Sequence, residues 1–183
     1  MITDPQNVFE LLQNDVAAKL MDTSPFNTIK MPDGSAFNVL TEDEGDIQFE
    51  FDAMIAQLGL AIVVHAPTGD VGQPDIGGTT EINGVTYLVP LITKLGFDVW
   101  ISEAPVFNRS AGGTNVRLTK AATMVMGILH GFQPDSVGSP VYLDSFKTER
   151  ERTYMNDQDK IGTLVVSRIC HFIAPQVAAE ITT

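Results

Sequence analysis

The stretch FDVWISEAPVFNRSAGGTNVRLTKAATMVMGILHGFQP, residues 97–134, decides the fold of this chain. It begins with apolar and aromatic residues that are typical of a buried strand and that end near Glu103. A turn rich in glycine follows at residues 108–115. Beyond it, residues 116–131 repeat apolar side chains at helical spacing, with Leu118, Val125 and Leu129 on one face. A strand that leads into a helix in this way predicts helices packed on a sheet.

Two more helices are predicted towards the N-terminus. Residues 5–21 carry apolar side chains at helical spacing after Asp4-Pro5, which favours a helix start. Residues 47–58 form a second apolar stripe, and Gly59 is a natural stop for a helix. Residues 60–66 (LAIVVHA) then predict a short buried strand. Between the two helices, the turn signal at residues 32–34 (PDG) favours a small hairpin.

The rest of the chain predicts strands and loops. Residues 68–83 are rich in Gly, Pro, Asp and Thr, which indicates a flexible surface loop. Residues 85–103 form either one long bent strand or a hairpin broken near residues 94–96. We favour the bent strand, with Pro90 or Gly96 at a bulge or an edge. Residues 141–154 and 161–173 predict a long hairpin, with a loose tail after residue 175.

Together these elements predict one domain that spans residues 1–183. Its class is α/β in the broad sense, and more closely α+β. We expect a mostly antiparallel mixed sheet with helices packed on one face and a long C-terminal hairpin.

Composition restricts the class of protein. Hydrophobic residues make up 44% of the 183 residues, which is enough to build a core without disulfides, and the single Cys170 cannot form one internally. A chain that forms no internal disulfide fits a cytosolic protein. The formal net charge of -12 argues against a free-standing nucleic-acid binder. No apolar run approaches the length of a membrane span, and the first seven residues lack the basic region of a signal peptide.

The sequence lacks the motifs of common chemistries. The acidic residues 42–52 lack the pattern of a calcium loop, and no nucleophile elbow or kinase motif occurs. The pair Gly112-Gly113 lacks the lysine of a phosphate loop, so Thr114 or Asn115 is better interpreted as the N-cap of the next helix. The three histidines, His65, His130 and His171, are not spaced as zinc ligands usually are. We therefore expect no catalytic residue, no metal site, no cofactor and no enzymatic activity.

The stretch that decides the fold resembles the phage tail-terminator family, also called tail-completion or minor tail proteins. The resemblance rests on a strand that ends in Glu103-Ala-Pro105, on Asn108-Arg109 after it, and on a helix that closes on residues 129–132 (LHGF). The helix ending at Gly59, the strand after it and the late hairpin are also similar to that family. Two features depart from it. Phe132 stands where a tryptophan is often expected, and residues 26–40 and 68–83 resemble additions.

The resemblance implies a structural virion protein of a long-tailed bacteriophage, located at the head-proximal end of the tail and assembled in the host cytoplasm. Such subunits form a homo-oligomeric ring, usually a hexamer. The ring caps the tail tube, stops polymerisation of the tube protein and offers a docking face to the head–tail connector or neck protein. DNA passes through its channel without specific binding, which a surplus of carboxylates would allow, and no membrane takes part.

This interpretation predicts two groups of functional residues. An acidic face that lines the channel is expected at Glu42, Asp43, Glu44 and Asp46. Subunit contacts are expected at Glu103, Asn108, Arg109, Lys147, Arg150 and Arg152. These subunit contacts have structural alternatives. Asn108 could instead bond within its own turn while Arg109 is solvated. The basic residues Lys147, Arg150 and Arg152 could instead form a solvated strand face. Trp100 lies inside an apolar strand and is expected in the core.

Two other functions stay open on the sequence. One is a neck or head-completion protein of similar fold. The other, from a different class, is a small-ligand-binding domain or enzyme that uses residues 68–83 as a lid. A ring with a hole would favour the phage functions, whereas a monomer with a concave apolar pocket would favour the ligand-binding domain.

Overall fold

A computed structural model describes residues 8–42, 46–71, 79–82, 85–88, 91–136, 140–154, 159–170 and 174–175. Helices combine with a mixed sheet, so the predicted α+β class is confirmed. The helices are α1 (Val8–Met21), the 3-10 helix η1 (Phe26–Thr28), α2 (Ile47–Leu58), α3 (Pro105–Asn108) and α4 (Leu118–Leu129). The strands are β1 (Leu40–Thr41), β2 (Leu60–Val71), β3 (Thr79–Ile82), β4 (Val85–Leu88), β5 (Leu91–Glu103), β6 (Val141–Tyr154), β7 (Asp159–Cys170) and β8 (Ala174–Pro175). None of the described helices is long and apolar enough to cross a bilayer.

Local sequence explains where α1 ends and where α2 begins and ends. α1 ends at Met21, as predicted, just ahead of Ser24-Pro25, because proline disfavours helical backbone in the residue before it. α2 begins after Asp46, whose carboxylate accepts a hydrogen bond from the Phe49 N–H at 3.3 Å. It ends at Gly59, which adopts a φ of 69°, in the left-handed region where glycine is favoured.

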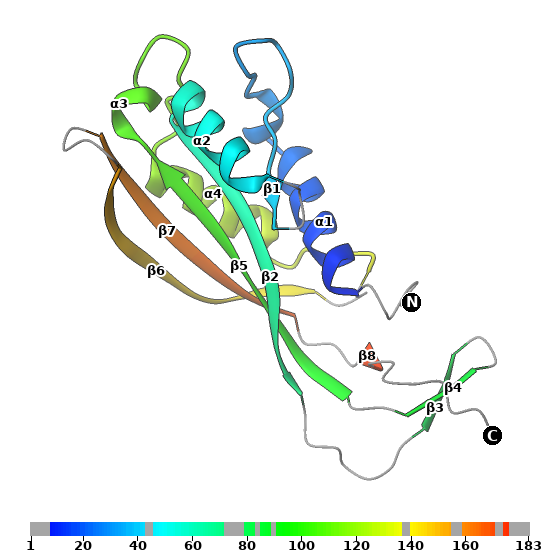
Figure 1. The fold of residues 1–183 in the computed structure, drawn as a ribbon. Helices are drawn as coiled ribbons and strands as arrows, with labels where there is room; N and C mark the ends of the chain where they lie inside the picture. The colour runs from blue at the N-terminus through cyan, green and yellow to red at the C-terminus, as the bar shows by residue number, and fades with distance from the viewer. Residues whose placement is uncertain are drawn as a thin grey trace.

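The main sheet has six strands in the order β1-β2-β5-β7-β6, with β8 paired to β5. β1 pairs with β2 in parallel and the other pairs are antiparallel, so the sheet is mixed and mostly antiparallel, as predicted. β6 and β7 form the predicted long hairpin, and β3 pairs with β4 in a separate sheet. Figure 1 shows the helices gathered around one part of the main sheet, while β2 and β5 run on together beyond them.

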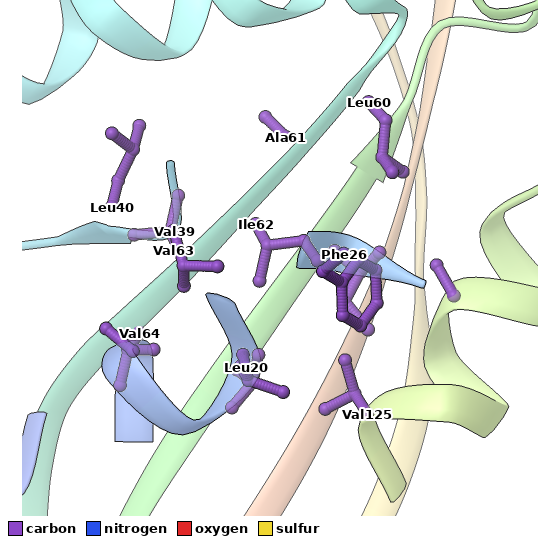
Figure 2. Packing of buried hydrophobic residues seen from close by; sticks show 14 of the residues in the cluster. Leu20, Phe26, Val39, Leu40, Leu60, Ala61, Ile62, Val63, Val64 and Val125 are labelled. Atoms are coloured by element: carbon purple, nitrogen blue, oxygen red, sulfur yellow. The ribbon is translucent and has the colours of Figure 1, made fainter. Parts of the chain in front are cut away.

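The core lies where β2 and β5 meet α1 and α4. These two helices pack against each other, α1 against β2, and α4 against β5 and β7. Leu60, Ile62 and Val64 alternate onto one face of β2 and are fully buried. Figure 2 shows their neighbours from three helices: Leu20, Phe26 and Val125. Because each large apolar side chain contributes about 1.5–3 kcal/mol when buried, this convergence holds the helices to the sheet.

Two sequence predictions are wrong in the strands. Residues 85–103 are not one bent strand, because β4 ends at Leu88, β5 begins at Leu91, and the two belong to different sheets. Pro90, which has no N–H for a ladder, lies between them in the sequence. Residues 68–83 are not a loop throughout, because β2 continues to Val71 and β3 begins at Thr79. Residues 72–78 and the tail after residue 175 lie outside the described residues.

The register of β2 and β5 has two irregularities, at neither Pro90 nor Gly96. One leaves Thr93 of β5 extra between the pairs Asp70–Lys94 and Val71–Ile92, and the other falls on β2. His65 pairs with Asp98 and Thr68 pairs with Gly96, so β2 has two residues where β5 has one. Pro67 falls inside this irregularity, where its missing N–H removes no ladder bond. The bulge lets β2 run past the end predicted at residue 66 and follow β5 further.

Candidate functional site

The motif on β5 and α3 forms a buried polar cluster of Glu103, Asn108 and Thr114. Glu103 is 5% exposed and Asn108 is fully buried. The Asn108 amide donates to Glu103 Oε1 at 2.8 Å and to the Val116 carbonyl at 3.0 Å. Asn108 Oδ1 accepts from the Thr114 hydroxyl at 2.6 Å, and that hydroxyl oxygen accepts from the Val116 N–H at 3.1 Å. Both polar atoms of the Asn108 side chain are therefore engaged within the chain.

Glu103 also caps α4. Its Oε2 accepts a hydrogen bond from the Leu118 N–H at 2.7 Å, and a carboxylate at a helix N-terminus interacts favourably with the helix dipole. The residue at the N-cap position, Arg117, makes no side-chain cap bond, and its Nε lies 3.7 Å from Glu103 Oε1. The prediction that Thr114 or Asn115 is the N-cap is wrong. Thr114 bonds within the turn, and Asn115 adopts a φ of 57° there.

Two glycines let the backbone close around Asn108. A Cβ on Gly59 would lie 2.0 Å from the Asn108 nitrogen, and one on Gly113 would lie 2.3 Å from the Asn108 carbonyl oxygen. The Ala104 N–H donates to the Gly59 carbonyl at 3.0 Å, which adds a direct bond between the segments. The end of α2, helix α3 and the turn before α4 are thus held as one unit.

The other end of the motif joins α4 to β6. Gly131 adopts a φ of 70°, and its N–H donates to the Val141 carbonyl at 3.0 Å. The Val141 N–H donates back to the Phe132 carbonyl at 2.7 Å. Lys19 Nζ of α1 lies 5.6 Å from the centroid of the Phe132 ring, which is cation–π range. The aromatic residue of the motif therefore connects α4, β6 and α1.

The segments that carry the buried polar cluster also carry exposed residues, which we call the basic surface: Val106, Arg109, Arg117 and Lys120. Val106 is 61% exposed. Among the described residues, no salt bridge involves Arg109 or Lys120. Of the three interface residues predicted on this motif, only Arg109 has its side chain at the surface. The hydrogen bonds support the alternative in which Asn108 bonds its own turn, and Glu103 is also engaged inside the subunit.

The predicted acidic face lies just before α2. Glu42 and Asp46 are exposed, whereas Asp43 and Glu44 lie outside the described residues. Glu42 Oε1 lies 2.5 Å from His65 Nδ1 on β2, which ties this segment to the sheet. The His65 ring packs on Trp100, with 4.3 Å between ring centroids. Trp100 packs against the core from its edge and is only partly buried.

The predicted basic contacts on the hairpin fall on β6. Lys147 and Arg152 pair in register with Val165 and Ile161 of β7. Arg150 falls in the register irregularity between Glu149 and Arg152. The side chains of this part of β6 lie outside the described residues, so their role in contacts stays a prediction.

Sequence reasoning overlooked Phe49, which is 70% exposed on α2. Since a helix turns by about 100° per residue, Phe49 lies about 200° around the axis from Ile47, which begins the buried stripe. A large aromatic residue opposite the apolar stripe of its own helix was therefore visible in the sequence.

The described segments contain no group of three His, Cys, Asp or Glu that could hold a metal ion. Hydrogen bonds from the Ser35 hydroxyl, at 2.6 Å, and from the Ser35 N–H, at 2.9 Å, lower the pKa of Asp33. This carboxylate shapes the exposed turn predicted at residues 32–34. The most organised polar arrangement, around Asn108, supports a charged surface and presents no reactive group to solvent.

Comparison with known proteins adds no assignment: no protein-family model matches the chain, and no curated protein matches it.

Proposed function

We propose that this chain is a structural subunit of a long-tailed bacteriophage that forms a ring at the head-proximal end of the tail tube. The ring stops tube polymerisation and joins the tail to the head connector. The proposal rests on the resemblance of residues 97–134 to tail terminators. It requires interfaces and no chemistry, so it involves no catalytic residue, cofactor or metal.

One observation carries the proposal most directly. The residues on which the resemblance rests are joined by hydrogen bonds, with Glu103 bonded to both Asn108 and the first turn of α4. Their bonding makes α3 and the start of α4 a firm support for exposed residues such as Arg109. A motif that organises a surface in this way suits a protein that works through contacts with neighbouring subunits.

The sheet offers edges for such contacts. In the described part of the chain, β7 is the only strand paired with β6, so the outer edge of β6 has no strand partner beyond Val141, which bonds to Gly131 and Phe132. β2 pairs with β1 over only Leu40–Thr41, opposite Val63 and Val64. Open edges of this kind are suited to strand addition, and a contact between two different surfaces can close into a ring.

Charge is compatible with passage of DNA. The net charge of -12 and the exposed carboxylates of Glu42 and Asp46 suit a channel that repels phosphate. In the proposal, this acidic segment before α2 faces the channel and the basic residues face neighbouring subunits.

The test is the native mass of the purified protein by light scattering, with negative-stain images of the same peak. We expect a ring with a central hole, formed either by the protein alone or after addition of purified tube protein. A monomer under both conditions would reject the proposal and favour the small-ligand-binding domain.

Adding the ring to growing tubes separates a terminator from a neck protein. A terminator binds the tube end and limits tube length. A neck or head-completion protein forms a ring but leaves tube growth unchanged.

A further inference from the structure

The described surface carries large exposed hydrophobic side chains at both ends of α2. Phe49, at its start, is 70% exposed, and Val106 of α3, next to its end, is 61% exposed. Figure 1 shows α3 beside the end of α2 from which β2 begins. Since α2 rises by about 1.5 Å per residue, Phe49 lies about 15 Å along the axis from Gly59, where α3 packs. The two side chains therefore belong to separate surfaces of one subunit.

The two surfaces carry opposite charge. Residues 31–93 contain no Lys or Arg, and Glu50 and Asp52 lie beside Phe49 on α2. Residues 104–134 contain no Asp or Glu, and Val106, Arg109, Arg117 and Lys120 are all exposed on this part of the chain. In a chain of net charge -12, a run of 31 residues without an acid is a marked local departure.

We infer that Phe49, Glu50 and Asp52 of one copy dock on the basic surface of the next copy. This inference rests on the proposed ring and names the two surfaces that would form it. The occupant is a second copy because this chain itself displays the complementary partner, an exposed aliphatic residue within a cationic surface. The aromatic ring becomes the buried anchor of the contact, and the charges around it set orientation.

The geometry suits a ring more than a symmetric dimer. The contact joins two different surfaces, so each copy has one of each left for another neighbour, and the chain of contacts closes if its rotation allows. The buried Asn108 bonds fix the backbone that carries Arg109, and Arg117 lies 3.7 Å from Glu103 within the same subunit, so the basic surface exists before assembly.

Charge reversal tests the inference without disturbing the fold, because Glu50 and Arg109 are both exposed. We expect E50K and R109E each to weaken the ring, since each places like charges together. The protein concentration at which half of the rings have dissociated should rise by about tenfold or more. The double variant E50K/R109E restores opposite charges at every contact and should return to within about threefold of the unaltered protein.

Two exposed residues elsewhere provide matched controls. E10K on α1 and K30E change the net charge as E50K and R109E do. Their protein concentration at half-dissociation should stay within about threefold of that of the unaltered protein. The measurement is light scattering against protein concentration, at low and high salt, with circular dichroism to check folding. Rings that persist equally in E50K, R109E and both controls would overturn this inference and leave the proposed ring standing. An unaltered chain that forms no ring, even with tube protein, would overturn both.

Discussion

Replacement of Asn108 by alanine should destabilise the subunit strongly, because the Asn108 side chain is fully buried and makes three hydrogen bonds. Its loss leaves Glu103 Oε1 and the Val116 carbonyl without this donor, and the Thr114 hydroxyl without its acceptor. A buried polar group left unpaired costs about 1–3 kcal/mol, so we expect a loss of about 3–5 kcal/mol in the free energy of unfolding. That is a large part of the stability of a typical domain, about 5–15 kcal/mol.

The assay is urea unfolding followed by the fluorescence of Trp100, the single tryptophan of the chain, and by circular dichroism. Asn27→Ala is the control, because Asn27 is exposed and donates one bond to the Asp22 carbonyl at 3.1 Å. It should lose less than about 1 kcal/mol. Variants are compared at one protein concentration, since association raises apparent stability. If Asn108→Ala loses no more than Asn27→Ala, the polar cluster does not hold this part of the fold together.

Three further predictions concern single turns and bonds. Gly59→Ala should destabilise by more than about 3 kcal/mol in the urea assay, because its Cβ would lie 2.0 Å from the Asn108 nitrogen, whereas Gly34→Ala, at a φ of 86° with open space around it, should lose only about 1–2 kcal/mol. Ser35→Ala should raise the pKa of Asp33 towards its ordinary value of 3.8, as measured by NMR titration of the carboxyl group. Because folding lowers this pKa, the ionised Asp33 turn stabilises the fold at pH values above the pKa of Asp33 in the unfolded chain. That stability is lost as pH falls through the pKa of Asp33 in the folded chain, and Ser35→Ala should reduce this loss. Gln13→Leu should cost about 1–3 kcal/mol, because the buried Gln13 amide donates to the Val64 carbonyl at 3.1 Å, while Asn14→Leu on the exposed side of α1 should be nearly neutral; equal losses in the two variants would contradict this role.

Periodicity in the sequence predicted the helices well. The stripe from Ile47 to Leu58 became α2, and Gly59 ended it in the left-handed conformation. Apolar spacing identified α4, although the helix is shorter than residues 116–131. These predictions succeed because helical spacing and glycine at a helix end depend on residues close in sequence.

Pairing partners were predicted less well. The sequence of residues 85–103 looks continuous, yet β4 pairs with β3 while β5 pairs with β2 and β7. Strand partners lie far away in the chain, and local apolar character does not say which edge a strand joins. The bulge at Pro67 became visible only when β2 lay beside β5.

For the candidate site, the sequence by itself identified the motif residues Glu103, Asn108 and Arg109. Only the tertiary structure decided what each residue does. It buried Glu103 and Asn108 in one hydrogen-bonded cluster, left Arg109 exposed, and made Glu103 the cap of α4 in place of Thr114 or Asn115. The physical reason is that a carboxylate can cap a helix 15 residues further along only after β5 and α4 have packed together, and burial follows from that packing.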